Sequence, residues 1–166
     1  CLASMGIYLF TAATMFDQLF RDAGRPQRNH DFGKNIIPDM INENRSVFAY
    51  PFVDENRKDA LYWRDVGTLD AYFEPNLDLT DIVPKLDMYD RDWPIWTDQI
   101  IAAPAKFVHD EDGRRGMAIS SLISQDCIVS GAIARRSLLF TGVKMGSFSE
   151  CEEAVILPYC NIGRHS

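Results

Sequence analysis

The feature that most constrains the fold of this chain is an internal repeat near its end. Residues 137–146 align without gaps with residues 154–163 at an offset of 17, and a weaker copy at 121–123 lies about 16 residues ahead of 138–139. Apolar residues recur every five or six positions in this region, at Ile128, Ile133, Leu138, Val143 and Phe148. Coils of this length, with three short strands and one inward apolar side chain per face, predict a stacked parallel β-helix.

An ordinary β-sandwich is the alternative fold for such a strand-rich region. Ten matched positions without a gap favour the β-helix, because sandwich strands have no reason to repeat at a fixed interval.

Residues 1–80 carry a different pattern, in which strand-like and helix-like segments alternate. Short apolar runs at 6–10 and 47–52 predict strands. One helix is predicted from Thr11 to Ala23 and another from Asp31 to Ile37, with Pro38 opposing its continuation to residue 41. A third is predicted to start at Thr68. This alternation predicts an α/β layer with a mainly parallel sheet.

These patterns divide the chain into three parts. We expect part of an α/β domain over 1–80, a linker over 81–115 and part of a β-helix over 116–166. The linker carries Pro84, Pro94 and Pro104 and is expected to contain short extended strands at 95–97 and 106–108. Since the chain begins at Cys1 and stops within a repeat, we expect it to be a piece of a longer protein.

Composition argues against several classes of function. Lys+Arg 17 and Asp+Glu 24 leave a net charge of −7, which disfavours nucleic-acid binding, since that depends on cations that neutralise phosphates. The longest uncharged run has 16 residues, fewer than the roughly 20 that span a bilayer, so no membrane association is expected. Four cysteines without CxxC spacing predict reduced thiols in a cytoplasmic protein and no zinc site.

The main candidate for chemistry is Asp65. The common signatures GxGxxG, GxSxG, HExxH and GxxxxGK followed by Ser or Thr are absent from the sequence. Asp65 follows Trp63 and Arg64 in a segment expected to be extended, just ahead of the helix start at Thr68. Ligands collect at such strand ends in open α/β sheets, and a carboxylate there could hold Mg²⁺ against a substrate phosphate. The alternative is a surface ion pair between Arg64 and Asp65, with Trp63 filling the core.

Two further clusters surround Ser4 and Asp31. Ser4 precedes a predicted strand, where it could hydrogen-bond a sugar hydroxyl or simply lead into the strand. Asp31 is expected to cap a helix. Its neighbour His30, taken alone, is too weak a signal to be assigned as a base or a metal ligand.

Together the clusters resemble one enzyme family. The strings at 3–8 (ASMGIY), 30–34 (HDFGK), 62–68 (YWRDVGT) and 86–95 (LDMYDRDWPI) resemble bacterial glucose-1-phosphate adenylyltransferases, also called ADP-glucose pyrophosphorylases. The resemblance continues through 104–108, 130–131 and 155–158, so it covers nearly the whole chain. It implies the C-terminal part of a Rossmann-like nucleotidyltransferase domain followed by a left-handed parallel β-helix.

The resemblance also implies a reaction and a set of site residues. The family makes ADP-glucose and pyrophosphate from ATP and glucose 1-phosphate, the committed step of bacterial glycogen synthesis, and its members are expected to be regulated homotetramers. Asp65 matches the family carboxylate that acts with Mg²⁺ and the sugar phosphate, which makes it the expected catalytic and metal-binding residue. Ser4 matches the serine that binds glucose 1-phosphate. The family's glycine-rich ATP loop and its Glu–Lys pair have no match in the chain, so these 166 residues alone are expected to be inactive.

Some positions depart from the family pattern, and two other functions compete. Pro75 lies where the third helix should continue, Gln125-Asp126 replaces a Gly-Gly pair, and residues 150–153 carry extra charge. A hexapeptide-repeat acyltransferase would need a catalytic histidine among the coils, where the sequence has His165 alone. A non-catalytic regulatory or assembly homologue would share the β-helix but would be expected to lose the carboxylate that this chain retains at Asp65.

Overall fold

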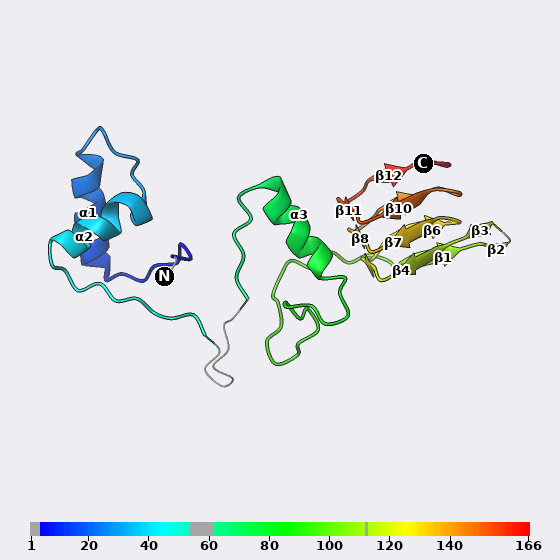
Figure 1. The fold of residues 1–166 in the computed structure, drawn as a ribbon, viewed down its shortest axis with the longest axis horizontal. Coiled ribbons are helices and arrows are strands. Elements are labelled where there is room, and N and C mark those ends of the chain that lie inside the picture. Colours follow the sequence, from blue (N-terminus) through cyan, green and yellow to red (C-terminus); the bar gives the residue numbers. More distant parts are fainter. Residues whose placement is uncertain (1–3, 54–61, 112) are drawn as a thin grey trace. The chain divides into compact units, whose positions relative to one another are not determined.

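The computed structural model describes residues 4–53, 62–111 and 113–166. The chain divides into two compact units, Cys1–Trp63 and Arg64–Ser166, and Figure 1 traces both along the sequence.

The first unit is built from helices that start where the sequence predicts. Its elements are α1 (Ala12–Ala23), a π-helical turn (Phe32–Ile36) and α2 (Ile37–Asn42). The Asp31 side chain caps the π-helical turn by accepting a hydrogen bond of 2.7 Å from the Lys34 amide. The predicted second helix therefore forms, and it continues past Pro38 as α2.

The π-helical turn explains how the helix passes Pro38. The Ile37 amide donates to the Phe32 carbonyl, five residues back, so the backbone is wider here than in an α-helix. Pro38 then lies in the first turn of α2, where an amide hydrogen has no partner within the helix and its loss costs little.

Charged side chains connect the helices of the first unit. Asp22 of α1 is buried and lies 2.7 Å from Nδ1 of His30. Arg28 donates through both terminal nitrogens to Asp39 of α2, and Arg25 donates to the same carboxylate at 2.7 Å. The Arg28 guanidinium lowers the pKa of Asp39.

The strands predicted at 6–10 and 47–52 do not form. The described residues of the first unit contain no β-strand, and Ile7 and Leu9 are 79% and 100% exposed. A strand is held by backbone hydrogen bonds to a neighbouring strand, and this unit offers none among its described residues. The run at 95–97, in the second unit, is likewise not a strand.

The second unit begins with α3 (Leu69–Asp78). The Thr68 hydroxyl caps it by accepting a hydrogen bond of 3.1 Å from the Ala71 amide, as predicted, and the helix continues through Pro75. On one side α3 contacts β11 of the β-helix.

The β-helix consists of parallel sheets on three faces (Figure 1). One sheet has the order β1-β6-β9-β12, and the others have the orders β4-β7-β10 and β5-β8-β11. The strands are β1 (Lys106–Val108), β4 (Met117–Ile119), β5 (Leu122–Ile123), β6 (Ile128–Ser130), β7 (Ile133–Arg135), β8 (Leu138–Leu139), β9 (Lys144–Met145), β10 (Glu150–Glu152), β11 (Val155–Ile156) and β12 (Asn161–Ile162).

The strand register confirms the repeat seen in the sequence. Leu138 pairs with Val155 at the predicted offset of 17, and Leu122 pairs with Leu138 at an offset of 16. The offset increases from 16 to 17 because the later coil has one more residue between β9 and β10, at the corner that carries Phe148. The segment 81–115, expected to be a linker, supplies β1, which pairs with β6.

The inward-facing residues differ from those predicted. Val143 is buried in the core as expected, but Phe148 is 43% exposed. At the other three positions, the inward-packing residues are Val129, Ala134 and Leu139, each directly after the predicted one. The core columns consist of Val129, Met145 and Ile162, of Ala118, Ala134 and Cys151, and of Ile123, Leu139 and Ile156. Side chains alternate along a strand, so the predicted period is correct, but at three of the five predicted positions the inward residue is the next one in the sequence.

A short hairpin leaves the first coil between β1 and β4. It pairs β2 (Asp110–Glu111) with β3 (Arg114–Arg115) in antiparallel fashion. The chain returns to the stack at Gly116, where a Cβ atom would lie 2.4 Å from the Val129 carbonyl oxygen. No other residue type leaves room for this approach between backbones.

Candidate functional site

Ser4 lies in a small polar and aromatic cluster of the first unit. Its hydroxyl is 2.9 Å from the Tyr8 hydroxyl and accepts a hydrogen bond of 3.2 Å from the Gly6 amide. Gly6 has φ of +74°, a left-handed conformation that glycine adopts without strain. The turn at Gly6 thus brings the Tyr8 side chain back to Ser4.

The Tyr8 ring is held by aromatic packing. It stacks on Phe32 with ring centroids 5.5 Å apart and an interplanar angle of 23°, and Phe10 lies 5.7 Å from the same Phe32 ring. Because Phe32 follows the Asp31 cap directly, the predicted clusters at Ser4 and Asp31 form one site. Sequence reasoning overlooked Tyr8, although its place four residues after Ser4 was an available signal.

Asp65 lies in the second unit, just ahead of α3. Its Oδ1 atom accepts a hydrogen bond of 3.1 Å from the Gly67 amide, and the residue is exposed. Among the described residues, no cation lies within ion-pair distance of this carboxylate. Asp65 therefore presents a negative charge to solvent from a defined turn.

The alternative of an Arg64–Asp65 surface pair is wrong. Arg64 turns to α3, where its Nη2 atom lies 2.8 Å from Asp78 Oδ2 and its Nη1 atom lies 3.7 Å from Glu74 Oε2. Trp63 is exposed, so it does not fill the core either.

Ser4 and Asp65 belong to different units, so the structure defines the surroundings of each one separately. His30 pairs with Asp22, which gives it a structural partner in the first unit.

One Asp65 oxygen fits a role in holding Mg²⁺, because Mg²⁺ is commonly bound through one or two carboxylates together with substrate phosphates. Within residues 4–53, 62–111 and 113–166, no group of three or more His, Cys, Asp or Glu side chains is placed to hold a metal ion. An ion at Asp65 would therefore need ligands from outside the described residues, such as phosphate oxygens.

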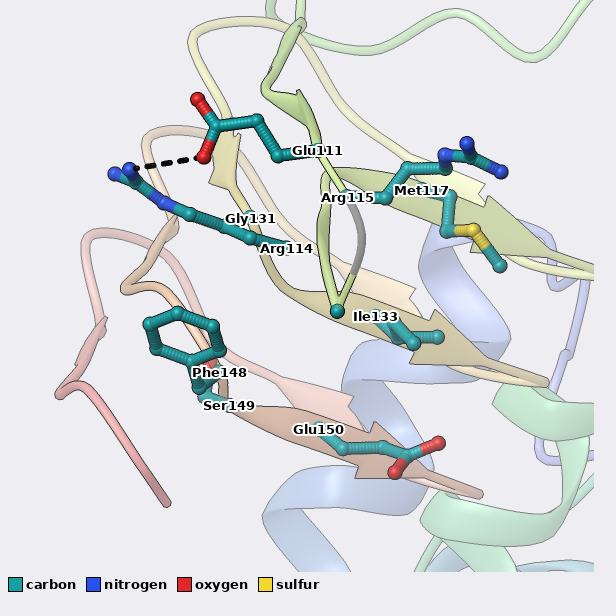
Figure 2. A pocket seen from close by; sticks show the side chains of 10 residues that line it. Glu111, Arg114, Arg115, Met117, Gly131, Ile133, Phe148, Ser149 and Glu150 are labelled. Atoms are coloured by element: carbon teal, nitrogen blue, oxygen red, sulfur yellow. Dashed lines mark ion pairs between the residues drawn. The ribbon is translucent and has the colours of Figure 1, made fainter.

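A shallow groove of about 470 Å³ lies on the outer face of the sheet β4-β7-β10, beside the hairpin (Figure 2). Its lining includes Arg114, Arg115, Met117, Ile133, Phe148 and Glu150. Arg114 bonds to Ser147 and His109 and lies 3.8 Å from Glu111, the pair marked in Figure 2. Glu150 pairs with Arg135 at 2.7 Å. Arg115 pairs with Asp110 at 2.5 Å. Since each of these charged side chains has a partner of opposite sign, the groove does not have the features of a phosphate site.

Helices in the described parts of the chain lack the length and apolar character needed to cross a membrane.

Known proteins resemble both parts of the chain. Residues 1–82 match the family described as nucleotidyl transferase, and residues 103–166 match the family described as GlmU-like, C-terminal hexapeptide. Hexapeptide repeats of this kind build a left-handed β-helix, so the predicted fold class is confirmed.

Longer relatives match nearly the whole chain. It is 73% identical over 166 residues to a protein of Novosphingobium aromaticivorans, 57% identical to one of Bradyrhizobium diazoefficiens and 54% identical to one of Mesorhizobium japonicum. Each is named glucose-1-phosphate adenylyltransferase, and each match covers 98–99% of this chain and 40% of the relative. The chain thus spans about two fifths of these relatives' length, and it belongs to the glucose-1-phosphate adenylyltransferase family.

Proposed function

We propose that this chain supplies the sugar-phosphate side of the active site and the first coils of the β-helix in a glucose-1-phosphate adenylyltransferase. The reaction joins ATP and glucose 1-phosphate into ADP-glucose and releases pyrophosphate. The observation that carries the proposal is the Asp65 carboxylate, which is exposed, oriented by the Gly67 amide and not paired with Arg64. Relatives that match 98% of the chain and carry this enzyme's name support it.

The proposed role of the chain is to position the substrates. A phosphate oxygen of glucose 1-phosphate attacks the α-phosphorus of ATP in line, and pyrophosphate leaves, so orientation and charge neutralisation supply most of the rate enhancement. Ser4, with its hydroxyl held by Tyr8, would bind a polar group of the sugar phosphate. Asp65 would hold Mg²⁺, which neutralises charge on the phosphates when bound.

The proposal extends to the setting of the enzyme. We expect a cytoplasmic homotetramer that acts in glycogen synthesis and responds to metabolite effectors. These expectations follow from the resemblance to the family.

The test is an assay of the full-length protein that carries this chain. Incubation with ATP, glucose 1-phosphate and Mg²⁺ should release pyrophosphate and produce ADP-glucose, measured separately by an enzyme-coupled assay and by chromatography. Asp65→Asn should remove most of this turnover. A folded wild-type protein that makes no nucleotide sugar from any nucleoside triphosphate would point to the non-catalytic homologue.

A further inference from the structure

Arg64 and Asp65 are neighbours in sequence, yet their side chains have different partners. Arg64 lies 2.8 Å from Asp78, the last residue of α3, whereas Asp65 accepts a hydrogen bond from the Gly67 amide. Arg64 and Asp65 therefore do not neutralise each other, and Arg64 binds α3 instead.

The segment that carries Asp65 lacks the backbone bonds of regular structure. Residues 62–67 form neither helix nor strand, so their position depends on side-chain contacts. One contact is the Thr68 cap at the start of α3, where the hydroxyl accepts from the Ala71 amide at 3.1 Å. A second is the ion pair between Arg64 and Asp78 at the far end of the helix.

The lengths of the two elements agree with this arrangement. The 10 residues of α3 span about 15 Å at 1.5 Å each. Four extended residues, from Arg64 to Thr68, reach at most about 14 Å. The segment therefore runs alongside α3, fastened at both ends of the helix.

Without Arg64, the Asp78 carboxylate would be unfavourable at this position. A carboxylate at a helix C-terminus faces the negative end of the helix dipole, which is unfavourable. Pairing with Arg64 offsets that repulsion. The Arg64 and Asp78 side chains are 34% and 33% exposed, so solvent screens their attraction only in part. Glu74, at 3.7 Å and 65% exposed, is the weaker partner.

We infer that Arg64 is a positioning residue, which sets the direction of the Asp65 carboxylate by tying the segment 62–68 to α3 through Asp78. The inference rests on the proposed function for the part that concerns catalysis. α3 also contacts β11, so the anchor for Asp65 belongs to the same unit as the β-helix.

The test compares variants of the full-length protein. Arg64→Gln and Asp78→Asn each remove the ion pair, their combination measures the coupling, and Arg64→Lys keeps the charge. The matched control is Asp70→Asn, at an exposed carboxylate in the first turn of α3. The readouts are kcat, the melting temperature and hydrogen exchange of the Gly67 amide, which donates to Asp65 Oδ1. Exchange of this amide reports on the turn that holds the Asp65 carboxylate and does not depend on turnover.

We expect Arg64→Gln and Asp78→Asn to lower kcat by about 10- to 100-fold, the scale of a small misplacement of a catalytic group. Both should speed exchange of the Gly67 amide, and the double variant should be no worse than the poorer single variant, because the two residues act as one unit. Arg64→Lys should recover part of the lost kcat, and Asp70→Asn should behave as wild type.

Two results would overturn the inference. If Arg64→Gln lowers kcat while Asp78→Asn leaves both kcat and exchange unchanged, Arg64 acts on the substrate directly. If both variants lower only the melting temperature, the pair is purely structural. A wild-type protein without activity would instead refute the proposed function, and unchanged exchange in the variants would then still refute the tie between Arg64 and the segment.

Discussion

The hydroxyl groups of Ser4 and Tyr8 lie 2.9 Å apart, and the Tyr8 ring is stacked on Phe32. A serine side chain has a freely rotating hydroxyl, whereas a stacked tyrosine presents its oxygen from a fixed ring. The contact therefore gives Ser4 a preferred direction before any substrate arrives.

Tyr8→Phe should weaken the binding of glucose 1-phosphate. The variant keeps the stack on Phe32 and removes the partner of Ser4, and one hydrogen bond contributes about 0.5–1.5 kcal/mol. We expect KM for the sugar phosphate in the full-length protein to rise by about 2- to 10-fold, with KM for ATP unchanged. Tyr89→Phe, at an exposed tyrosine, is the control, and an equal response of both variants would argue against this role.

Asp65→Asn should abolish most turnover without affecting the fold. Loss of one charged transition-state contact costs about 2.7–4 kcal/mol, or roughly 10²–10³ in kcat. The melting temperature should stay close to that of wild type, because Asp65 is exposed. Asp70→Asn, an exposed neighbour in α3, serves as the control. A kcat within about threefold of wild type, far below the expected loss, would exclude Asp65 as a catalytic residue.

Gly116→Ala should destabilise the β-helix. The new methyl group would lie 2.4 Å from the Val129 oxygen and 2.6 Å from the Val108 oxygen, and both belong to backbones that cannot move independently. We expect a loss of about 1–3 kcal/mol in the free energy of unfolding, as for other overpacked sites. At Gly24 a new methyl group would make only ordinary contacts, 3.6 Å from the Arg21 oxygen and 3.8 Å from the Phe20 oxygen, and the dihedral angles are ordinary. Equal denaturation midpoints for Gly116→Ala and Gly24→Ala would therefore contradict the prediction.

Asp39 should contribute stability that disappears in acid. The neighbouring Arg28 lowers the pKa of Asp39 below its ordinary value of 3.8, so the carboxylate stabilises the fold above that value and loses this effect as the pH falls through its lowered pKa. The difference in melting temperature between wild type and Asp39→Asn should therefore be largest above about pH 4 and shrink below it. A difference that stays constant down to the acid limit would show that the charge has no role.

The cysteines should differ in reactivity. Burial raises the pKa of the Cys127 thiol, and its sulfur lies 3.0 Å from the Phe140 carbonyl oxygen, so little of the reactive thiolate forms. Cys160 is exposed. Brief treatment of the native protein with maleimide at neutral pH should label Cys160 and leave Cys127 unmodified until denaturant is added. Mass spectrometry of the digested protein would show whether this order holds.

Local sequence signals predicted where the helices start, but strand pairing could not be predicted from local sequence. Asp31 and Thr68 cap helices within three residues of themselves, so their effect depends on the nearby sequence alone. The apolar runs at 6–10 and 47–52 are different, because a strand depends on a partner elsewhere in the chain. Hydrophobicity showed that these runs can be buried but did not show what would pair with them.

The repeat gave the length of a coil but not its inward face. Ile128 and Val129 are adjacent apolar residues, as are Leu138 and Leu139, so the pattern fits either phase and the strand register decides. At the site, resemblance pointed to Ser4 and Asp65, while the partner of Arg64 stayed hidden because Asp78 is 14 positions away. Glu74 and Asp78, four residues apart on α3, were an acidic pair that could have suggested it.

The hairpin at the first coil has a consequence for how such proteins diversify. Val108 pairs with Ser130 and Met117 pairs with Ile133. Met117 follows Val108 by nine positions, whereas Ile133 follows Ser130 by three. The hairpin thus adds six residues to the first coil, and the strand pairs before and after it stay in register. New sequence can therefore be acquired at this corner without any change to the interior. The same position suits protein engineering, since a peptide tag or a reporter loop grafted between Val108 and Met117 would be displayed on the surface by a scaffold that stays intact.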